Sequence, residues 1–101
     1  MEIKQTLNGK DLTISLEGSL DTTTAPELKK TLDGTMGNID SLTLDFDKLE
    51  YVSSVGLRVM LQAHNIMAKK GGMKIIQVNE EIVDTLEITG LLDMLNVEKK
   101  A

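Results

Sequence analysis

The hydrophobic residues of this chain switch repeatedly between two spacings, and the order of these switches constrains its fold most strongly. Apolar and polar residues alternate over residues 12–16 and 42–46, Ile3, Gln5 and Leu7 occupy alternate positions over residues 3–7, and a short β-rich run covers residues 73–78. Alternation of this kind is typical of half-buried strands. Residues 55–70 instead carry apolar side chains at the helical spacing of i, i+3 and i+4. A helix is therefore predicted between the third and fourth strands.

Two further helices are predicted where apolar residues follow capping signals. Leu28 and Leu32 follow residues 24–27, whose sequence Thr-Ala-Pro-Glu has the form of a capping box. Residues 82–90 follow Asn79, a favoured N-cap residue. The resulting order is strand, strand, helix, strand, helix, strand, helix. It predicts an α/β domain with a mixed sheet and right-handed crossovers.

Glycines and charged residues mark the expected ends of these elements. Residues 8–10, Asn-Gly-Lys, predict a hairpin turn between the first two strands. Gly18 and Asp21 are expected to end the second strand. The central helix is expected to end at residues 69–72, Lys-Lys-Gly-Gly, where cations complement the negative end of the helix dipole. The basic residues there are interpreted as a solvated helix end.

The composition fits a single globular domain over residues 1–101 and argues against nucleic-acid binding. A chain of 101 residues is too short for two independent cores. It has 11 basic and 16 acidic side chains, a net charge of −5, and only Phe46 and Tyr51 as aromatics. Nucleic-acid binding proteins need cationic and stacking surfaces, which this composition lacks.

Few side chains are suited to metal binding or acid–base catalysis. The absence of cysteine excludes disulfides, thiolate metal sites and cysteine nucleophiles. The single histidine, His64, falls on the apolar stripe of the central helix, where we expect it to pack half-buried. Asp45 and Asp47 share one face of a strand, but no third ligand accompanies them, so we interpret them as solvated. We therefore expect no metal ion and no cofactor.

No signal peptide and no membrane-spanning stretch is visible in the sequence. The residues after Met1 lack an apolar h-region. The longest apolar run is far shorter than the ~20 residues that cross a bilayer. These features predict a cytoplasmic protein without direct membrane insertion.

Ser53 and Ser54 lie where the third strand runs into the central helix. Either serine is a natural N-cap, and capping is the commonest role of serine at such a position. Alternatively, a hydroxyl exposed at the positive end of a helix is suited to phosphorylation. Neither serine is suited to nucleophilic catalysis, because His64 lies roughly 15 Å further along the same helix.

Three segments together resemble the STAS domain family (sulfate transporter and anti-sigma factor antagonist). Residues 18–21, Gly-Ser-Leu-Asp, follow the second strand; residues 51–57 open the central helix; and residues 89–91, Thr-Gly-Leu, lie near the end. Their order and spacing match over nearly the whole chain, in the form of the stand-alone bacterial anti-sigma factor antagonists. The resemblance implies one STAS domain over residues 1–101. Its fold would be a mixed four- to five-stranded sheet with helices packed mainly on one face.

The resemblance also implies a protein-binding switch that is not an enzyme. In this family the unphosphorylated antagonist binds an anti-sigma factor that is a serine kinase, and the sigma factor is released. Phosphorylation of a serine at the start of the central helix ends the complex, and a metal-dependent serine phosphatase resets it. Alignment on Gly56 places that serine at Ser54. Ser53 then stands where the family has aspartate, and Val55 where it has a hydroxyl residue.

The resemblance also gives an expected partner-binding surface. Asp21 matches the family's acidic residue at the kinase-binding surface. The expected partner-binding residues are Asp21, Thr22, Thr23, Thr24, Ser53, Ser54, Gly56 and Arg58.

Other classes of function remain open at this stage. The main alternative is a STAS subunit of a membrane transport or stress-sensing assembly that is never phosphorylated. A small-ligand or nucleotide-binding domain is less favoured, because no glycine-rich cradle accompanies the helix start. An enzymatic function is the least favoured hypothesis.

Overall fold

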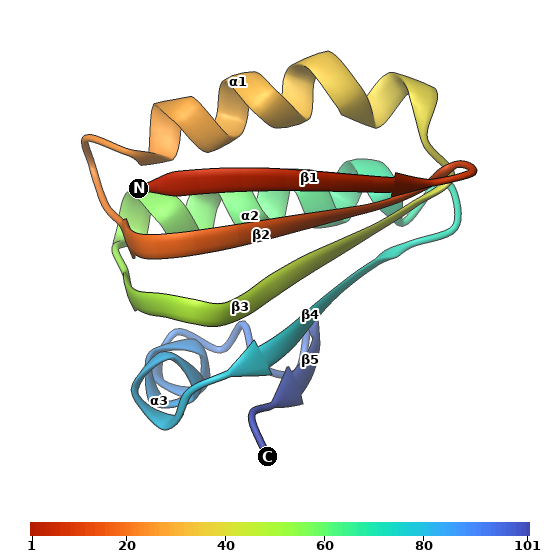
Figure 1. Cartoon of the computed structure of the whole chain (residues 1–101). Helices are drawn as coiled ribbons and strands as arrows, with labels where there is room; N and C mark the ends of the chain where they lie inside the picture. The colour runs from red at the N-terminus through yellow and green to blue at the C-terminus, as the bar shows by residue number, and fades with distance from the viewer.

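The computed structural model describes all 101 residues as a five-stranded sheet with three α-helices (Figure 1). Its elements in chain order are β1 (Glu2–Asn8), β2 (Asp11–Leu20), α1 (Ala25–Thr35), the 3-10 turn η1 (Met36–Asn38), β3 (Ser41–Val52), α2 (Ser54–Met67), β4 (Met73–Val78), α3 (Glu80–Ile88) and β5 (Asn96–Lys99). The strand order is β1-β2-β3-β4-β5. The β1–β2 pair is antiparallel and the other pairs are parallel. The predicted α/β class and mixed sheet are confirmed.

The helices lie together on one face of the sheet. Because each crossover moves to the next strand in the same direction, right-handed connections place α1, α2 and α3 on the same side. In Figure 1, α2 runs behind β1 and β2. The core between the layers is a single cluster of 26 buried residues, almost all aliphatic, with Phe46 as its one aromatic.

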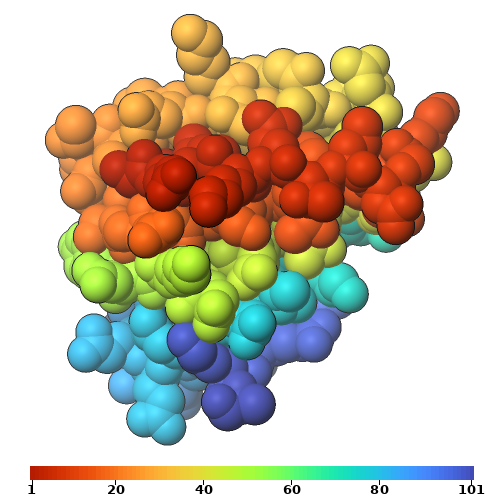
Figure 2. All heavy atoms as spheres, viewed as in Figure 1, coloured from red at the N-terminus to blue at the C-terminus, as the bar shows by residue number.

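The opposite face of the sheet carries no helix, and its side chains are polar. One row crosses all five strands in register and consists of Thr6, Thr13, Thr43, Lys74 and Asn96. In Figure 2 the strands lie at the front of the molecule with no helix over them. Such a face is typical of a sheet that one layer of helices covers.

Asp47 and its neighbour Asp45 occupy this polar face without forming a metal site. Asp47 is exposed and forms an ion pair with Lys100, with Oδ1 and Nζ 2.9 Å apart. The Asp47 backbone N–H donates to Oδ1 of Asp45 at 3.0 Å. No group of three potential metal-ligating side chains gathers anywhere in the chain.

The second strand ends directly before Asp21, as predicted, but the prediction that Gly18 ends it is wrong. It continues to Leu20 through a register shift against β3 between Gly18 and Ser19, and Gly18 has a φ of 104°. Glycine adopts this backbone conformation without a Cβ penalty. The extra residue at this shift is Glu50, so the bulge lies in β3 opposite Gly18 and Ser19. The shift places Leu20 directly opposite Val52, the last residue of β3. Both strands therefore finish at the same level.

The basic residues after α2 are only partly a solvated helix end. Lys70 Nζ donates to the backbone oxygens of Met36, at 2.6 Å, and Ile39, at 3.1 Å. These carbonyls follow the C-terminal end of α1, where a cation complements the helix dipole. Lys70 thus joins the end of one helix to the end of its neighbour.

Candidate functional site at the carboxyl ends of β2 and β3

Two loops that each lead from a strand into a helix lie side by side at one edge of the sheet. The β2–α1 loop begins at Asp21, and the β3–α2 loop consists of Ser53 alone. The backbone N–H of Ser53 donates to the carbonyl of Leu20 at 2.8 Å, which ties the two loops together. The carboxyl ends of parallel strands are the usual place for binding residues in open α/β sheets.

Asp21 caps the chain that enters α1. Its Oδ1 accepts from the backbone N–H groups of Thr23, at 2.9 Å, and Thr24, at 3.0 Å. Its carbonyl accepts from the N–H of Ala25 at 2.8 Å. These contacts are those of an N-cap residue, one turn before the predicted start of the helix.

The predicted capping box at Thr24 is wrong, because its hydroxyl is already engaged. Thr24 Oγ1 donates to the carbonyl of Ser19 at 2.7 Å and accepts from the backbone N–H of Asp21 at 2.8 Å. Thr24 itself has helical φ and ψ and makes no side-chain capping bond to α1. The hydroxyl therefore fastens the loop to β2.

The pKa of Asp21 lies below its ordinary value of 3.8. The largest cause is the hydrogen bond from the Thr24 backbone N–H, and the Thr23 N–H acts in the same direction. Both bonds favour the ionised form of the carboxyl group. Asp21 therefore places a fixed negative charge beside the start of α2 at neutral pH.

The structure separates the roles of the two serines. Ser53 is the N-cap of α2, and its Oγ accepts from the backbone N–H of Gly56 at 3.2 Å. Ser54 is the first helical residue, its side chain is exposed, and its hydroxyl makes no hydrogen bond within the chain. The sequence left open whether each serine caps the helix or presents a free hydroxyl, and in the structure Ser53 is the one that caps α2. The free hydroxyl belongs to Ser54.

Gly56 is buried beneath this surface. A Cβ at Gly56 would lie 2.8 Å from Leu20 Cγ and 3.0 Å from the Leu20 carbonyl oxygen. The missing side chain therefore lets the first turn of α2 rest against the end of β2. Gly56 therefore supports the predicted partner-binding surface through this close packing, and it is itself buried.

The remaining predicted residues are exposed. Thr22 and Thr23 lie in the first loop, and Arg58 lies one turn after Ser54 on α2. Arg58 forms no ion pair, since the two ion pairs of the chain involve lysines. No acidic side chain occurs in the first turn of α2.

Tyr51 is a surface residue at this edge that was not among the predicted partner-binding residues. Its side chain is 55% exposed, and it pairs with Ser19 near the end of β3. The alternation of buried and exposed residues breaks after Phe46, where β3 gains two extra residues relative to β2. That break in period is the signal that could have indicated an outward-facing aromatic.

A third helix start lies close to the same strands. Asn79 caps α3, and its Oδ1 accepts from the backbone N–H of Ile82 at 2.9 Å, as its sequence position predicted. Its Nδ2 also donates to the carbonyl of Leu49 on β3 at 3.1 Å. This second bond fastens α3 to the sheet, so the polar atoms of Asn79 serve the fold.

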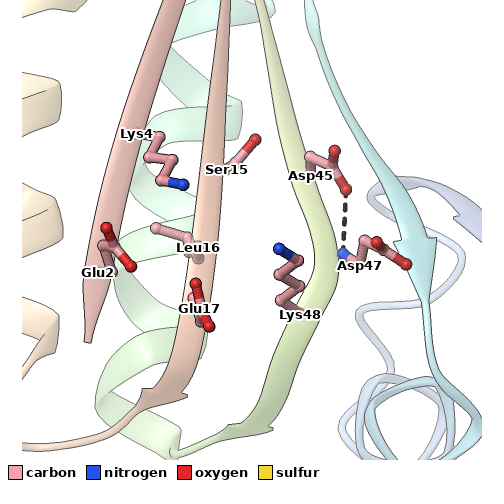
Figure 3. Close-up of a pocket in the computed structure, with 8 residues that line it drawn as sticks. All are labelled: Glu2, Lys4, Ser15, Leu16, Glu17, Asp45, Asp47 and Lys48. Carbon is pink, nitrogen blue, oxygen red and sulfur yellow. Dashed lines mark hydrogen bonds between the residues drawn. The ribbon is translucent and has the colours of Figure 1, made fainter.

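The molecule also has a shallow hollow on the helix-free face, of about 150 Å³. In Figure 3, Lys4 on β1 and Lys48 on β3 extend toward β2 from opposite sides. The carboxylates of Glu2, Glu17, Asp45 and Asp47 also line the hollow. This mixture of charges does not single out one class of ligand.

His64 is half-buried, as expected for a packing residue. Its Nδ1 atom is buried and has no hydrogen-bond partner. It lies ten residues after Ser54 on the same helix, so it does not act as a base for either serine.

Comparison with known proteins identifies the family of this fold. The family model described as the STAS domain matches residues 2–101. The anti-sigma-B factor antagonist of Bacillus subtilis (strain 168) is 26% identical over 102 residues, which cover 100% of this chain and 92% of that protein.

Three solved structures, of two proteins, share the fold at lower sequence identity. The Bacillus anti-sigma factor antagonist SpoIIAA superposes with a TM-score of 0.82 in its unphosphorylated form, at 13% identity, covering 95% of this chain and 87% of that one. The phosphorylated form of SpoIIAA superposes with a TM-score of 0.75 at 14% identity, covering 95% of this chain and 90% of that one. A sulfate transporter family protein of Wolinella succinogenes superposes with a TM-score of 0.78 at 15% identity, covering 94% of this chain and 81% of that one. None of the helices in this chain is long and apolar enough to span a bilayer.

Proposed function

This chain belongs to the STAS domain family, and from that premise we propose that it is an anti-sigma factor antagonist controlled by phosphorylation of Ser54. In its unphosphorylated form it binds an anti-sigma factor that is also a serine kinase, and a sigma factor is released. Phosphorylation of Ser54 ends the complex, and a serine phosphatase restores the binding form. The protein acts in the cytoplasm as a binding switch without enzymatic activity of its own.

The observation that carries this proposal is that the two serines have different roles at the start of α2. Because Ser53 caps α2, the hydroxyl of Ser54 is exposed and makes no bond within the chain. A modifying enzyme can therefore reach Ser54 without breaking a structural contact. The capping role of Ser53 also explains how the helix start tolerates serine in the position where the family has aspartate.

The docking surface is proposed to comprise the exposed residues around Ser54. Thr22 and Thr23 project from the first loop, Arg58 follows Ser54 by one helical turn, and Asp21 supplies the fixed negative charge. The similarity to the Bacillus subtilis anti-sigma-B factor antagonist over the whole chain supports this assignment.

Electrostatics accounts for the switch without a change of fold. A phosphate on Ser54 adds about −1.5 to −2 charges at neutral pH. In the free protein, the positive end of the α2 dipole offsets this charge by ~0.3–1 kcal/mol. The first turn of α2 carries no acidic side chain, and the Asp21 carboxylate opposes the phosphate from the neighbouring loop. In the complex the same charge is desolvated against the partner, and an unpaired buried charge costs several kcal/mol.

The proposal is tested by measuring binding to, and phosphorylation by, a purified anti-sigma factor kinase from the same organism. Ser54→Ala should bind the kinase but accept no phosphate. Ser54→Asp should bind at least about 100-fold more weakly, since a few kcal/mol corresponds to that factor. Ser53→Ala is the matched control and should still be phosphorylated at Ser54. Equal affinity of the wild type and Ser54→Asp would refute the phosphorylation switch.

A second candidate function is favoured by the similarity to a sulfate transporter family protein. In that case the domain serves as a subunit of a membrane transport assembly, and Ser54 is never modified. Constitutive copurification with membrane transport components, unchanged by Ser54→Asp, would support it. Failure of Ser54 to accept phosphate from any candidate kinase would be the accompanying result.

A further inference from the structure

The two edges of the sheet differ in how they are protected from pairing with another chain. The edge strand β5 has only four residues, and its pairing with β4 is interrupted by a register shift. The edge strand β1 has seven residues, without proline, and pairs with β2 without a register shift. Short, irregular strands protect an edge, whereas a long regular strand leaves it open to pairing. Figure 1 shows β1 as the outermost strand at its side of the sheet.

The unpaired side of β1 is open to solvent. Residues 4–8 are all exposed, and Leu7 is 62% exposed although its neighbour on the same face, Ile3, packs partly against the core. No other part of the chain pairs with this side of the strand. An exposed leucine on an open edge is the feature that a partner strand would cover.

The hairpin determines which backbone groups of β1 are free. Asn8 and Asp11 form the last pair before the turn, and Gly9 has a φ of 67° while Lys10 does not have a positive φ, as in a type II′ turn. In such a hairpin the pair that closes the turn exchanges hydrogen bonds, and the bonding direction then alternates along the strand. The N–H and C=O groups of residues 3, 5 and 7 therefore point away from β2.

These free groups are self-complementary when a second β1 strand runs antiparallel about Gln5. Ile3 then faces Leu7 of the second copy, Gln5 faces Gln5, and the three pairs exchange about six hydrogen bonds. The two apolar side chains cover one another on the helix side. On the opposite side, Lys4 faces Thr6, and no like charges lie directly opposite.

Other registers that align the free groups are poorer. A shift by two residues toward the N-terminus places Lys4 opposite Lys4 and leaves Leu7 outside the pairing. Like charges directly opposite one another destabilise a strand pair. A shift by two residues the other way leaves Ile3 without a partner. The register centred on Gln5 alone pairs all three free positions.

We propose that two copies of this chain associate through their β1 strands in this register. The two sheets then form one continuous sheet across a twofold axis at Gln5. A single strand pair covers less surface than a standard protein interface, so the association is weak and depends on concentration. The proposal does not depend on the function assigned to Ser54.

Charge changes at Thr6 test the register, because Thr6 is exposed and faces Lys4 of the second copy. Sedimentation velocity between about 10 µM and 1 mM covers the range expected for a weak interface. Thr6→Glu should lower the dissociation constant by roughly threefold to tenfold, since it creates two opposite-charge pairs. Thr6→Lys should raise it by a similar factor. Asn96→Lys is the matched control, because it adds the same positive charge as Thr6→Lys to an exposed residue of the same row, at the other edge of the sheet.

Amide hydrogen exchange provides a second readout at residue level. The N–H groups of Ile3, Gln5 and Leu7 should exchange rapidly in dilute protein and more slowly in concentrated protein. Those of Lys4 and Thr6 bond to β2 in the monomer and should be protected at both concentrations. Gln5→Pro removes an outward N–H, which an edge strand tolerates, and should abolish association.

Several outcomes would overturn the proposal. It is wrong if the wild type remains monomeric throughout this range. It is also wrong if Thr6→Lys and Asn96→Lys weaken association equally, or if the outward amides show no dependence on concentration. Ser54→Asp should leave association unchanged, so the result is separable from the test of the phosphorylation switch.

Discussion

The starts of α1 and α2 lie side by side at the same edge of the sheet, yet their polar side chains are used differently. In the α1 loop, the Asp21 carboxylate and the Thr24 hydroxyl are both held by hydrogen bonds to the backbone. At the α2 start, Ser53 is bonded and Ser54 is free. The first loop is therefore a fixed charged surface, whereas the second presents a hydroxyl that can change its chemistry.

The largest expected effect comes from disturbing the contact that holds these two starts together. Gly56→Ala places a methyl group within 3.0 Å of Leu20, so we expect a loss of about 2 kcal/mol in unfolding free energy from overpacking. Urea unfolding measures this change. Gly34→Ala in α1 is the matched control, because nothing lies within 4 Å of its added Cβ. It should stabilise the protein by about 0.5–1 kcal/mol, and a similar loss in both variants would contradict the packing argument.

A smaller loss is expected when the charged cap of α1 is removed. Asp21→Ala leaves the N–H groups of Thr23 and Thr24 without their acceptor. The urea midpoint should fall by less than in Gly56→Ala. Asp21→Asn keeps an acceptor oxygen and should recover most of the loss. Identical midpoints for Asp21→Ala and the wild type would show that the cap contributes nothing.

How far the sequence predicted this site depended on whether the deciding contacts are local. The cap at Asn79 was predicted because an N-cap bond spans three residues of one segment. The role of Thr24 was not predicted, because its hydroxyl donates to the carbonyl of Ser19 on the preceding strand. The bulge in β3 opposite Gly18 depends on the register between β2 and β3, which alternation within one strand does not reveal. The strand β5 has Val97 as its only apolar residue, so it has almost no pattern of its own.

The same distinction explains why the sequence narrowed the site to two serines without choosing between them. Ser53 and Ser54 are chemically identical and adjacent. Ser53 becomes the cap because its N–H bonds to the Leu20 carbonyl, which holds it in extended conformation with a φ of −85° and a ψ of 172°. That bond is made between two strand ends far apart in sequence.

The contrast between the two serines can be measured directly. Ser53→Ala removes the acceptor for the Gly56 N–H and should cost about 1 kcal/mol, as for other N-cap substitutions. Ser54→Ala removes no bond and should change the unfolding free energy by less than about 0.5 kcal/mol. Urea unfolding of the two variants in parallel provides the comparison. If Ser54→Ala were the more destabilising variant, the assignment of cap and free hydroxyl would be reversed.

The smallest expected effect is the part of the Asp21 contribution that depends on its charge. The pKa of Asp21 is lowered in the folded protein, chiefly by the Thr24 N–H, relative to its ordinary value of 3.8. The unfolded chain therefore binds this proton more readily, and the stabilisation is fully present above about pH 4 and lost as the pH falls through the folded pKa. Urea unfolding from about pH 6 to pH 3 should show the wild type losing its advantage over Asp21→Asn toward the acid end. A constant difference between the two proteins would mean that the charge of Asp21 does not stabilise the first loop, and that the contrast with the α2 start lies in hydrogen-bond geometry alone.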